Sequence, residues 1–171
     1  RARFTEQCRA ALEAQAAHDG TRIAVLCAGL DRFRLVNGQL GSGSGDLVLR
    51  EVARRISDAF DGRVVARLGG DRFGVVCSEQ GKRVEHARFA ERLRRVCDRP
   101  FRVDGHDIEL TISVGIAVST PDHDGHDADR LMLDAEDAMR RAKQLGGDRC
   151  ITADLSLAAE IAATRAREDA L

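Results

Sequence analysis

The sequence predicts an α+β domain in which helices pack against a largely antiparallel sheet. Two short apolar runs, residues 64–68 and 73–77, flank a turn that begins with two glycines, which is the usual sign of a hairpin. Other segments carry apolar residues at helical spacing. With 171 residues, of which 43% are hydrophobic and 32% charged, the chain has the size of one compact domain with its own core.

The first half of the chain is expected to contain a helix, a buried strand and a second helix. The first helix covers residues 4–17, with Gly20 as its stop. The continuous apolar run 23–30 has strand length and is typical of a central strand covered on both faces. A glycine-rich turn at 41–45 then leads to an amphipathic helix, whose apolar residues recur every four positions at Val48, Val52, Ile56 and Phe60.

The second half of the chain follows the hairpin. A charged helix is expected over 84–97, and residues 101–118 predict two strands that turn at Asp104-Gly105. A further helix has its apolar residues between 131 and 142 and is stopped by Gly146-Gly147, a glycine C-cap. A last strand near Cys150 and a final helix from Leu155 complete the order.

Charge and cysteine content argue against several classes of protein. The 27 basic and 28 acidic residues leave a net charge of -1, so no overall field attracts nucleic acid or anionic lipid. Five widely spaced cysteines suit reduced, buried thiols in a cytoplasmic protein better than a disulfide framework or a zinc site. The longest apolar run is too short to cross a bilayer. Because the chain starts with Arg1, we expect it to be a piece of a longer protein.

The turn Gly69-Gly70-Asp71-Arg72 is the first candidate for chemistry. Glycines let the backbone approach a ligand closely, and an acid at the tip of the turn is able to hold a metal that binds phosphate. An ordinary hairpin explains the same four residues.

Asn37 and Asp46 are candidates for reading a guanine base. Residues 29–37 begin at the end of the expected central strand, where active-site groups gather in open sheets, and Asp46 lies near the start of the long helix. A carboxylate accepts from two adjacent guanine N–H donors, and an amide supplies or accepts the remaining bonds. Taken alone, Asp46 is equally well explained as an acid favoured by the helix dipole.

Two other charged segments are less specific. The basic residues at 140–143 are able to contact phosphates, but a solvated last turn of a helix explains them equally well. The acid- and histidine-rich segment 122–127 lacks the spacing and the closing glutamate of an EF-hand, so we expect a solvated loop there.

Five segments, taken together and in this order, resemble the GGDEF family of diguanylate cyclases. They span nearly the whole chain, which makes the resemblance far more specific than any one motif. The segments are 30–37 (LDRFRLVN), 40–41 with 45–46, 67–73 (RLGGDRF), 111–117 (TISVGIA) and 135–143.

The resemblance implies a central, mostly antiparallel sheet of five strands, like that of nucleotide cyclases and polymerase palms. It implies one GTP per domain and two domains meeting face to face, with two divalent metals, normally Mg²⁺, assisting attack of one GTP on the other. Asp71 matches the catalytic, metal-binding acid, and the backbone of Leu30 matches a further metal ligand. The nucleotide-binding positions match Asn37, Asp46, Arg34, Phe33, Lys143, Gly69 and Gly70.

The chain departs from the family at the metal site. Gly29 stands where members usually carry a metal-binding aspartate, and Arg72 stands where the signature normally has glutamate. A cation at position 72 is expected to weaken a divalent-metal site and to pair with Asp71 instead. Metal binding is therefore expected to be weak or absent.

Two further features of the family, a phosphate-side arginine and an inhibitory product site, are also missing. An arginine expected after Lys143 is replaced by Gly147. The inhibitory product site, an Arg-x-x-Asp sequence, would fall on Phe60 and Arg63 and is absent.

These matches and departures favour a catalytically impaired, GTP-binding regulatory module of a bacterial cyclic-di-GMP signalling protein. Residues 1–153 are expected to form the GGDEF domain, and 154–171 a linker helix that leads to a following domain, such as an EAL phosphodiesterase. A homodimer, and a covalently linked EAL or sensory domain, are the expected partners besides GTP. The alternatives are an active diguanylate cyclase, with Asp71 as its acid, and a dimerisation module without a ligand.

Overall fold

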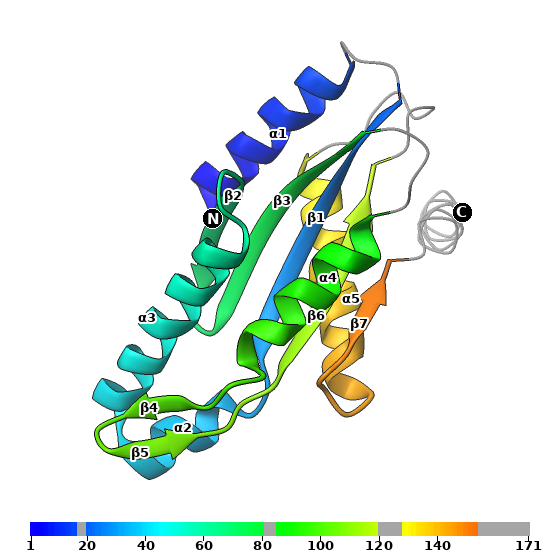
Figure 1. Ribbon diagram of the computed structural model, residues 1–171. Helices are drawn as coiled ribbons and strands as arrows, with labels where there is room; N and C mark the ends of the chain where they lie inside the picture. The colour runs from blue at the N-terminus through cyan, green and yellow to red at the C-terminus, as the bar shows by residue number, and fades with distance from the viewer. Residues whose placement is uncertain (17–19, 81–84, 120–127, 154–171) are drawn as a thin grey trace, which may run out of the picture.

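The computed structural model describes residues 1–16, 20–80, 85–119 and 128–153 (Figure 1). Five strands form the central sheet in the order β2-β3-β1-β6-β7, and only the β6–β7 pair is parallel. The prediction of an α+β domain with a mostly antiparallel five-stranded sheet is confirmed. The elements are α1 (Ala2–Ala16), β1 (Thr21–Leu30), α2 (Phe33–Leu40), α3 (Ser42–Ala59), β2 (Val64–Gly69), β3 (Arg72–Gln80), α4 (His86–Arg94), β4 (Phe101–Val103), β5 (His106–Ile108), β6 (Ile112–Val118), α5 (Ala128–Gln144) and β7 (Cys150–Thr152).

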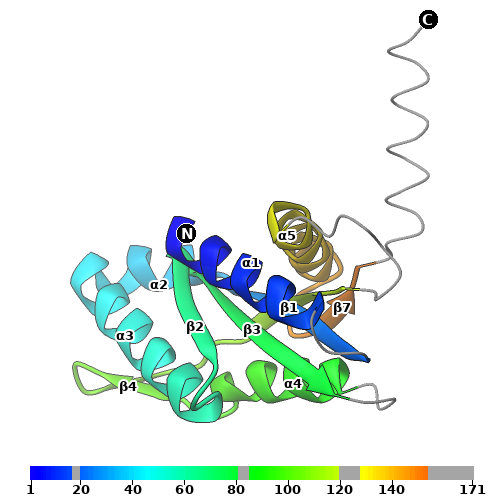
Figure 2. The same ribbon diagram turned by 90° about the horizontal axis from the view of Figure 1, so that it is seen from above.

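Helices cover both faces of the sheet. Figure 2 shows α1 and α5 on one side, and α3 and α4 on the other. Successive side chains of a strand point to opposite faces, and β1 supplies both cores in alternation. Leu26 and Leu30 belong to the core under α3 and α4, whereas Val25 and Cys27 belong to the core under α1 and α5. The continuous apolar run in the sequence therefore has the cause that was predicted, namely a central strand covered on both faces.

Most of the predicted helices and strands are present, with three corrections. The glycine-rich turn expected at 41–45 is reduced to Gly41, whose φ is 87°, because α3 already begins at Ser42. The eight-residue helix α2 directly before it was not predicted. Residues 101–118 form three strands rather than two.

The third correction follows from which sheet each strand joins, because β4 and β5 form a separate two-stranded sheet and β6 belongs to the central one. The hairpin of β4 and β5 turns at Asp104-Gly105, as predicted, and both residues have the positive φ of a tight hairpin turn. The chain then leaves this small sheet, and β6 begins at Ile112 as a neighbour of β1. The charged helix expected over 84–97 ends at Arg94 and continues as a short 3-10 turn, Arg95–Cys97. The helix expected from Leu155 lies outside the described residues, as does the 122–127 loop.

Helix α5 lies directly on β6, and this contact requires a glycine. A Cβ atom at Gly115 would lie 2.0 Å from the carbonyl oxygen of Ala135 and 2.3 Å from the backbone nitrogen of Met139. Backbone atoms cannot rotate away as a side chain can. The close approach therefore sets the height of α5 above the sheet, and with it the position of the last turn of α5.

The five cysteines are free, and four of them are buried. Burial raises the pKa of the thiols of Cys27 and Cys97 to about 12. The predicted burial of the thiols is confirmed, except that Cys150 is only half-buried. Within the described ranges, no helix is long and apolar enough to span a bilayer.

Candidate nucleotide site

The tip of the β2–β3 hairpin is held against the end of β1. Gly69 and Gly70 have φ angles of 124° and 56°, which glycine adopts without the strain that a Cβ atom would bring. The Arg67 side chain donates to the carbonyl of Gly70 across the turn at 2.9 Å. The backbone N–H of Leu30 donates to the carbonyl of Asp71 at 3.2 Å. The glycine-glycine-acid turn is thus fixed beside the last residue of the central strand.

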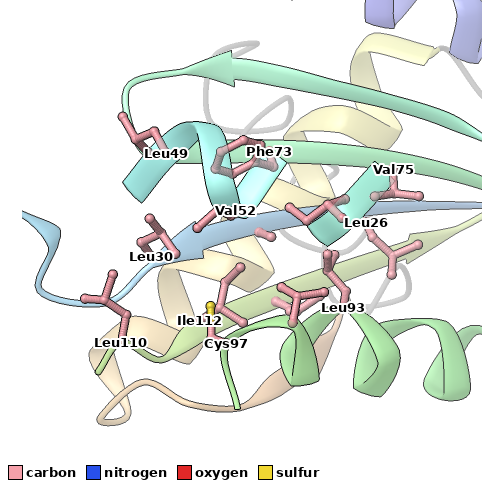
Figure 3. Close-up of a cluster of buried hydrophobic side chains, with 14 of the residues drawn as sticks. Leu26, Leu30, Leu49, Val52, Phe73, Val75, Leu93, Cys97, Leu110 and Ile112 are labelled. Carbon is pink, nitrogen blue, oxygen red and sulfur yellow. The ribbon is translucent and has the colours of Figure 1, made fainter. Parts of the chain in front are cut away.

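The last turn of α5 brings Lys143 to the same place. Its ammonium donates to the carbonyl oxygen of Leu30 at 2.8 Å, and it lies 3.5 Å from Oδ2 of Asp71. The side chain of Leu30 is fully buried and points into the core beside Phe73 and Val52 (Figure 3), so only the backbone of Leu30 is available to a ligand. The structure therefore brings together three residues predicted for the site from segments far apart in the sequence.

Gly29 provides the space that Lys143 occupies. A Cβ atom at Gly29 would lie 2.7 Å from Cε of Lys143 and 2.8 Å from Sδ of Met139. Both distances are shorter than van der Waals contacts. The aspartate usual in the family would therefore require this lysine conformation to change. The replacement of aspartate by glycine removes a carboxylate and also opens the place in which the ammonium lies.

Arg72 does not follow the expected pairing. It was expected to pair with Asp71, but its guanidinium lies 3.6 Å from the carboxylate of Glu136, and Lys143 is the cation placed beside Asp71. Glu136 is 3% exposed and is also bound by the side chain of Arg1. Sequence reasoning missed Glu136. A glutamate between Ala135 and Ala138, at the edge of an apolar helix face, was the available signal.

The guanine-reading candidates lie at the junction of α2 and α3. Oδ1 of Asn37 packs closely against Gly45. A Cβ atom at Gly45 would lie only 1.8 Å from this oxygen. Asp46 follows Gly45 directly, so Asn37 packs against the turn of α3 that carries this carboxylate. Both side chains are exposed to solvent. Phe33 is 8% exposed and belongs to the core beneath the junction, whereas Arg34 is exposed on α2.

Asp31 organises the backbone around the site and was not assigned a role from the sequence. Its carboxylate accepts hydrogen bonds from the hydroxyl groups of Thr111 and Ser113 at 2.7 Å, and from the backbone N–H of Asp148 at 2.9 Å. A Cβ atom at Gly147 would lie 2.8 Å from this carboxylate. Asp31 thus ties the end of β1 to β6 and to the loop after α5. The same loop caps α5, as predicted, through the N–H groups of Gly146 and Gly147.

The donor set does not fit the two-metal centre that the family resemblance implies. Asp71 is one carboxylate, and the Leu30 carbonyl beside it already accepts a hydrogen bond from Lys143. Over the part of the chain that the structure describes, no three His, Cys, Asp or Glu side chains come close enough together to hold a metal ion. Hard divalent cations favour several oxygen ligands. The cation that lies beside both of these oxygens in the structure is the ammonium of Lys143.

The chain belongs to the GGDEF family, which functions in cyclic-di-GMP signalling. The family described as "Diguanylate cyclase, GGDEF domain" matches residues 1–149. The GGDEF domain of TpbB (YfiN) from Pseudomonas aeruginosa has a similar crystal structure. Its TM-score is 0.83 at 32% identity, over 91% of this chain and 96% of that one. The GGDEF domain of DgcB from Caulobacter crescentus, solved in complex with c-di-GMP, has a TM-score of 0.72 at 27% identity over 86% of each chain.

A curated relative is much longer than this chain. The bifunctional diguanylate cyclase/cyclic di-GMP phosphodiesterase MucR of Pseudomonas aeruginosa is 38% identical over 133 residues. That alignment covers 77% of this chain but only 19% of MucR. The similarity therefore concerns one domain of a larger protein.

Proposed function

We propose that this domain binds GTP and, with its cyclase chemistry impaired, regulates an adjoining domain of the same protein. The junction of Asn37 with Gly45 and Asp46 carries the first half of the proposal, because it keeps both guanine-reading candidates together. The impairment is inferred from Gly29 and from Lys143, which lies beside the one remaining acid. Without placed metal charge, the transition state of phosphoryl transfer loses its main source of stabilisation.

The wider setting of the domain is part of the proposal. Residues 1–153 are assigned to the GGDEF domain and 154–171 to a linker that leads to a following domain, for which an EAL-type phosphodiesterase is the first candidate. The two named activities of MucR support this choice, although they are properties of MucR. We place the domain in the cytoplasm, where reduced cysteines are the rule and GTP is available. Two copies meeting face to face are the expected assembly.

A weak diguanylate cyclase is the second candidate. Asp71 is retained, and its backbone carbonyl accepts a hydrogen bond from the N–H of Leu30 at 3.2 Å. The backbone that would hold a metal is therefore in position. Formation of cyclic-di-GMP from GTP and Mg²⁺ by the purified chain would support this candidate and contradict impairment.

GTP affinity is expected to depend on Asn37. Removing a hydrogen-bonding partner of a ligand costs about 1–3 kcal/mol, so Asn37→Ala should weaken GTP binding by roughly tenfold to a hundredfold. Calorimetric titration with GTP measures the loss, and ATP provides a test of base selectivity. Gln39→Ala, at an exposed position of the same helix, is the control and should leave the affinity unchanged. Equal losses for both variants, or no GTP binding by the unmodified domain, would contradict the proposal.

Regulation is expected to appear as a change in the neighbour's activity. If the intact protein contains a phosphodiesterase domain, saturating GTP should change its rate of cyclic-di-GMP hydrolysis, and Asn37→Ala should shift the effect to higher GTP concentration. Such coupling requires GTP to favour one arrangement of the two domains over another. A rate indifferent to saturating GTP would leave the domain without a regulatory role.

A further inference from the structure

The ammonium group of Lys143 lies beside the two oxygens that the family resemblance assigns to metal, the Leu30 carbonyl and the Asp71 carboxylate. We propose that this ammonium is a built-in replacement for the divalent cation, so that the domain binds the triphosphate of GTP without Mg²⁺. The inference rests on the proposed function, because it assigns a mode of binding to the same site. The inference goes beyond the proposed function because it states that GTP binding at this site does not require a metal ion.

The first argument is the position of the ammonium. It donates to the Leu30 carbonyl at 2.8 Å and lies 3.5 Å from the Asp71 carboxylate. These are the backbone and side-chain oxygens that the family resemblance assigns to metal. An ammonium has three donors, so after these two contacts a third N–H is available to a phosphate oxygen. The side chain is 32% exposed, and a ligand can therefore reach it.

The second argument is that Gly29 and Lys143 depend on each other. A Cβ atom at position 29 would lie only 2.7 Å from the Cε atom of Lys143. Any larger residue there would push the lysine, or Met139 beside it, out of place. The position of the ammonium beside Leu30 and Asp71 thus depends on the glycine at position 29. The glycine removes a carboxylate and at the same time makes room for the lysine side chain.

The third argument is charge. Asp71 and Lys143 together carry no net charge, so the pair gives a divalent cation no attraction. A divalent cation on the Leu30 carbonyl would also lie next to the ammonium, and like charges at such distances repel. A polyphosphate is favoured by the wider cluster, in which Lys143, Arg72 and Arg1 carry three positive charges against the two negative charges of Asp71 and Glu136. The local field therefore favours the phosphate and disfavours the metal.

The test compares GTP binding with excess Mg²⁺ and with EDTA, by calorimetry on the intact chain. We expect the two dissociation constants to differ by less than about threefold. Binding only with Mg²⁺ would overturn the inference and leave the proposed function intact. Absence of binding under both conditions would overturn the proposed function and this inference with it. Direct titration with Mn²⁺, followed by electron paramagnetic resonance, should detect no tight site without nucleotide, and a micromolar site would contradict the inference.

The variant Lys143→Ala separates an ammonium that binds phosphate from one that merely holds the hairpin. In EDTA, it should weaken GTP binding by about tenfold or more, the loss of a charge-assisted hydrogen bond. Mn²⁺ should restore part of the loss, because the vacated place between Leu30 and Asp71 is then open to a cation. Arg88→Ala removes the same charge from an exposed position of α4, across the sheet, and should change neither value. Unaltered GTP binding by a folded Lys143→Ala domain would overturn the inference, and thermal unfolding establishes that the variant is folded.

Discussion

The variant Gly115→Ala is expected to lower the free energy of unfolding by roughly 3 kcal/mol or more, the upper range for overpacking a core. The added methyl would lie 2.0 Å from the Ala135 carbonyl oxygen and 2.3 Å from the Met139 nitrogen. Neither atom can move unless α5 itself rises from the sheet. Because α5 carries Lys143, the same displacement should also weaken GTP binding in any folded fraction.

Urea denaturation measures the effect, with Gly43→Ala as the matched control. Gly43 lies in α3, and a Cβ atom there would meet nothing within 4 Å. Alanine in an exposed helix is more favourable than glycine by about 0.5–1 kcal/mol, so the control should be slightly stabilised. A loss below about 1 kcal/mol for Gly115→Ala would mean that α5 is not tightly packed on β6.

The sequence was most informative where the pattern of apolar residues within one strand or helix reflects how that element is buried. The run from Ile23 to Leu30 predicted a central strand because both of its faces are covered, and the two cores confirm that cause. Helix α2 was missed because it has only eight residues, includes Gly38, and buries only Phe33 and Val36. Two apolar positions are too few to establish a helical period.

The site was predictable only in part, for a related reason. Family resemblance assigned Asp71 and the Leu30 backbone to metal and Lys143 to phosphate, and the structure brings the three residues together. The charge of Arg72 predicted that it would pair with Asp71, which it does not. The actual arrangement depends on the absence of a Cβ atom at Gly29, because Lys143, 114 positions further along the chain, occupies the space that this atom would need. Such a dependence is a matter of packing across the fold, and local sequence patterns carry no signal of it.

Asp31 and Glu136 illustrate the same limit. Each is an acid whose partners come from distant segments, with Asp31 bound by Thr111 and Ser113, and Glu136 by Arg1 and Arg72. Read along the sequence, both look like ordinary surface acids. Their roles become visible only when the sheet places β1, β3, β6 and α5 at one end.

The variant Gly29→Asp is expected to change the cation preference of the site. Its Cβ atom would meet Cε of Lys143 and Sδ of Met139, which are far ends of flexible side chains and can move at modest cost. Two carboxylates, at positions 29 and 71, would then face the Leu30 carbonyl. A pair of negative charges with a carbonyl favours a divalent cation over an ammonium, because Coulomb attraction grows with the charge of the ion.

We therefore expect Gly29→Asp to bind Mn²⁺ at least about tenfold more tightly than the unmodified domain, since ligand charge is a main determinant of affinity for such cations. GTP binding should at the same time become dependent on Mg²⁺. The control is Gly29→Asn, which has nearly the same shape and displaces Lys143 equally but adds no charge. If displacement alone opened the site, both variants would gain Mn²⁺ binding. Metal-independent GTP binding by a folded Gly29→Asp domain would contradict the inference. It would mean that the new carboxylate pairs with Lys143 and that the ammonium is not in the metal's place.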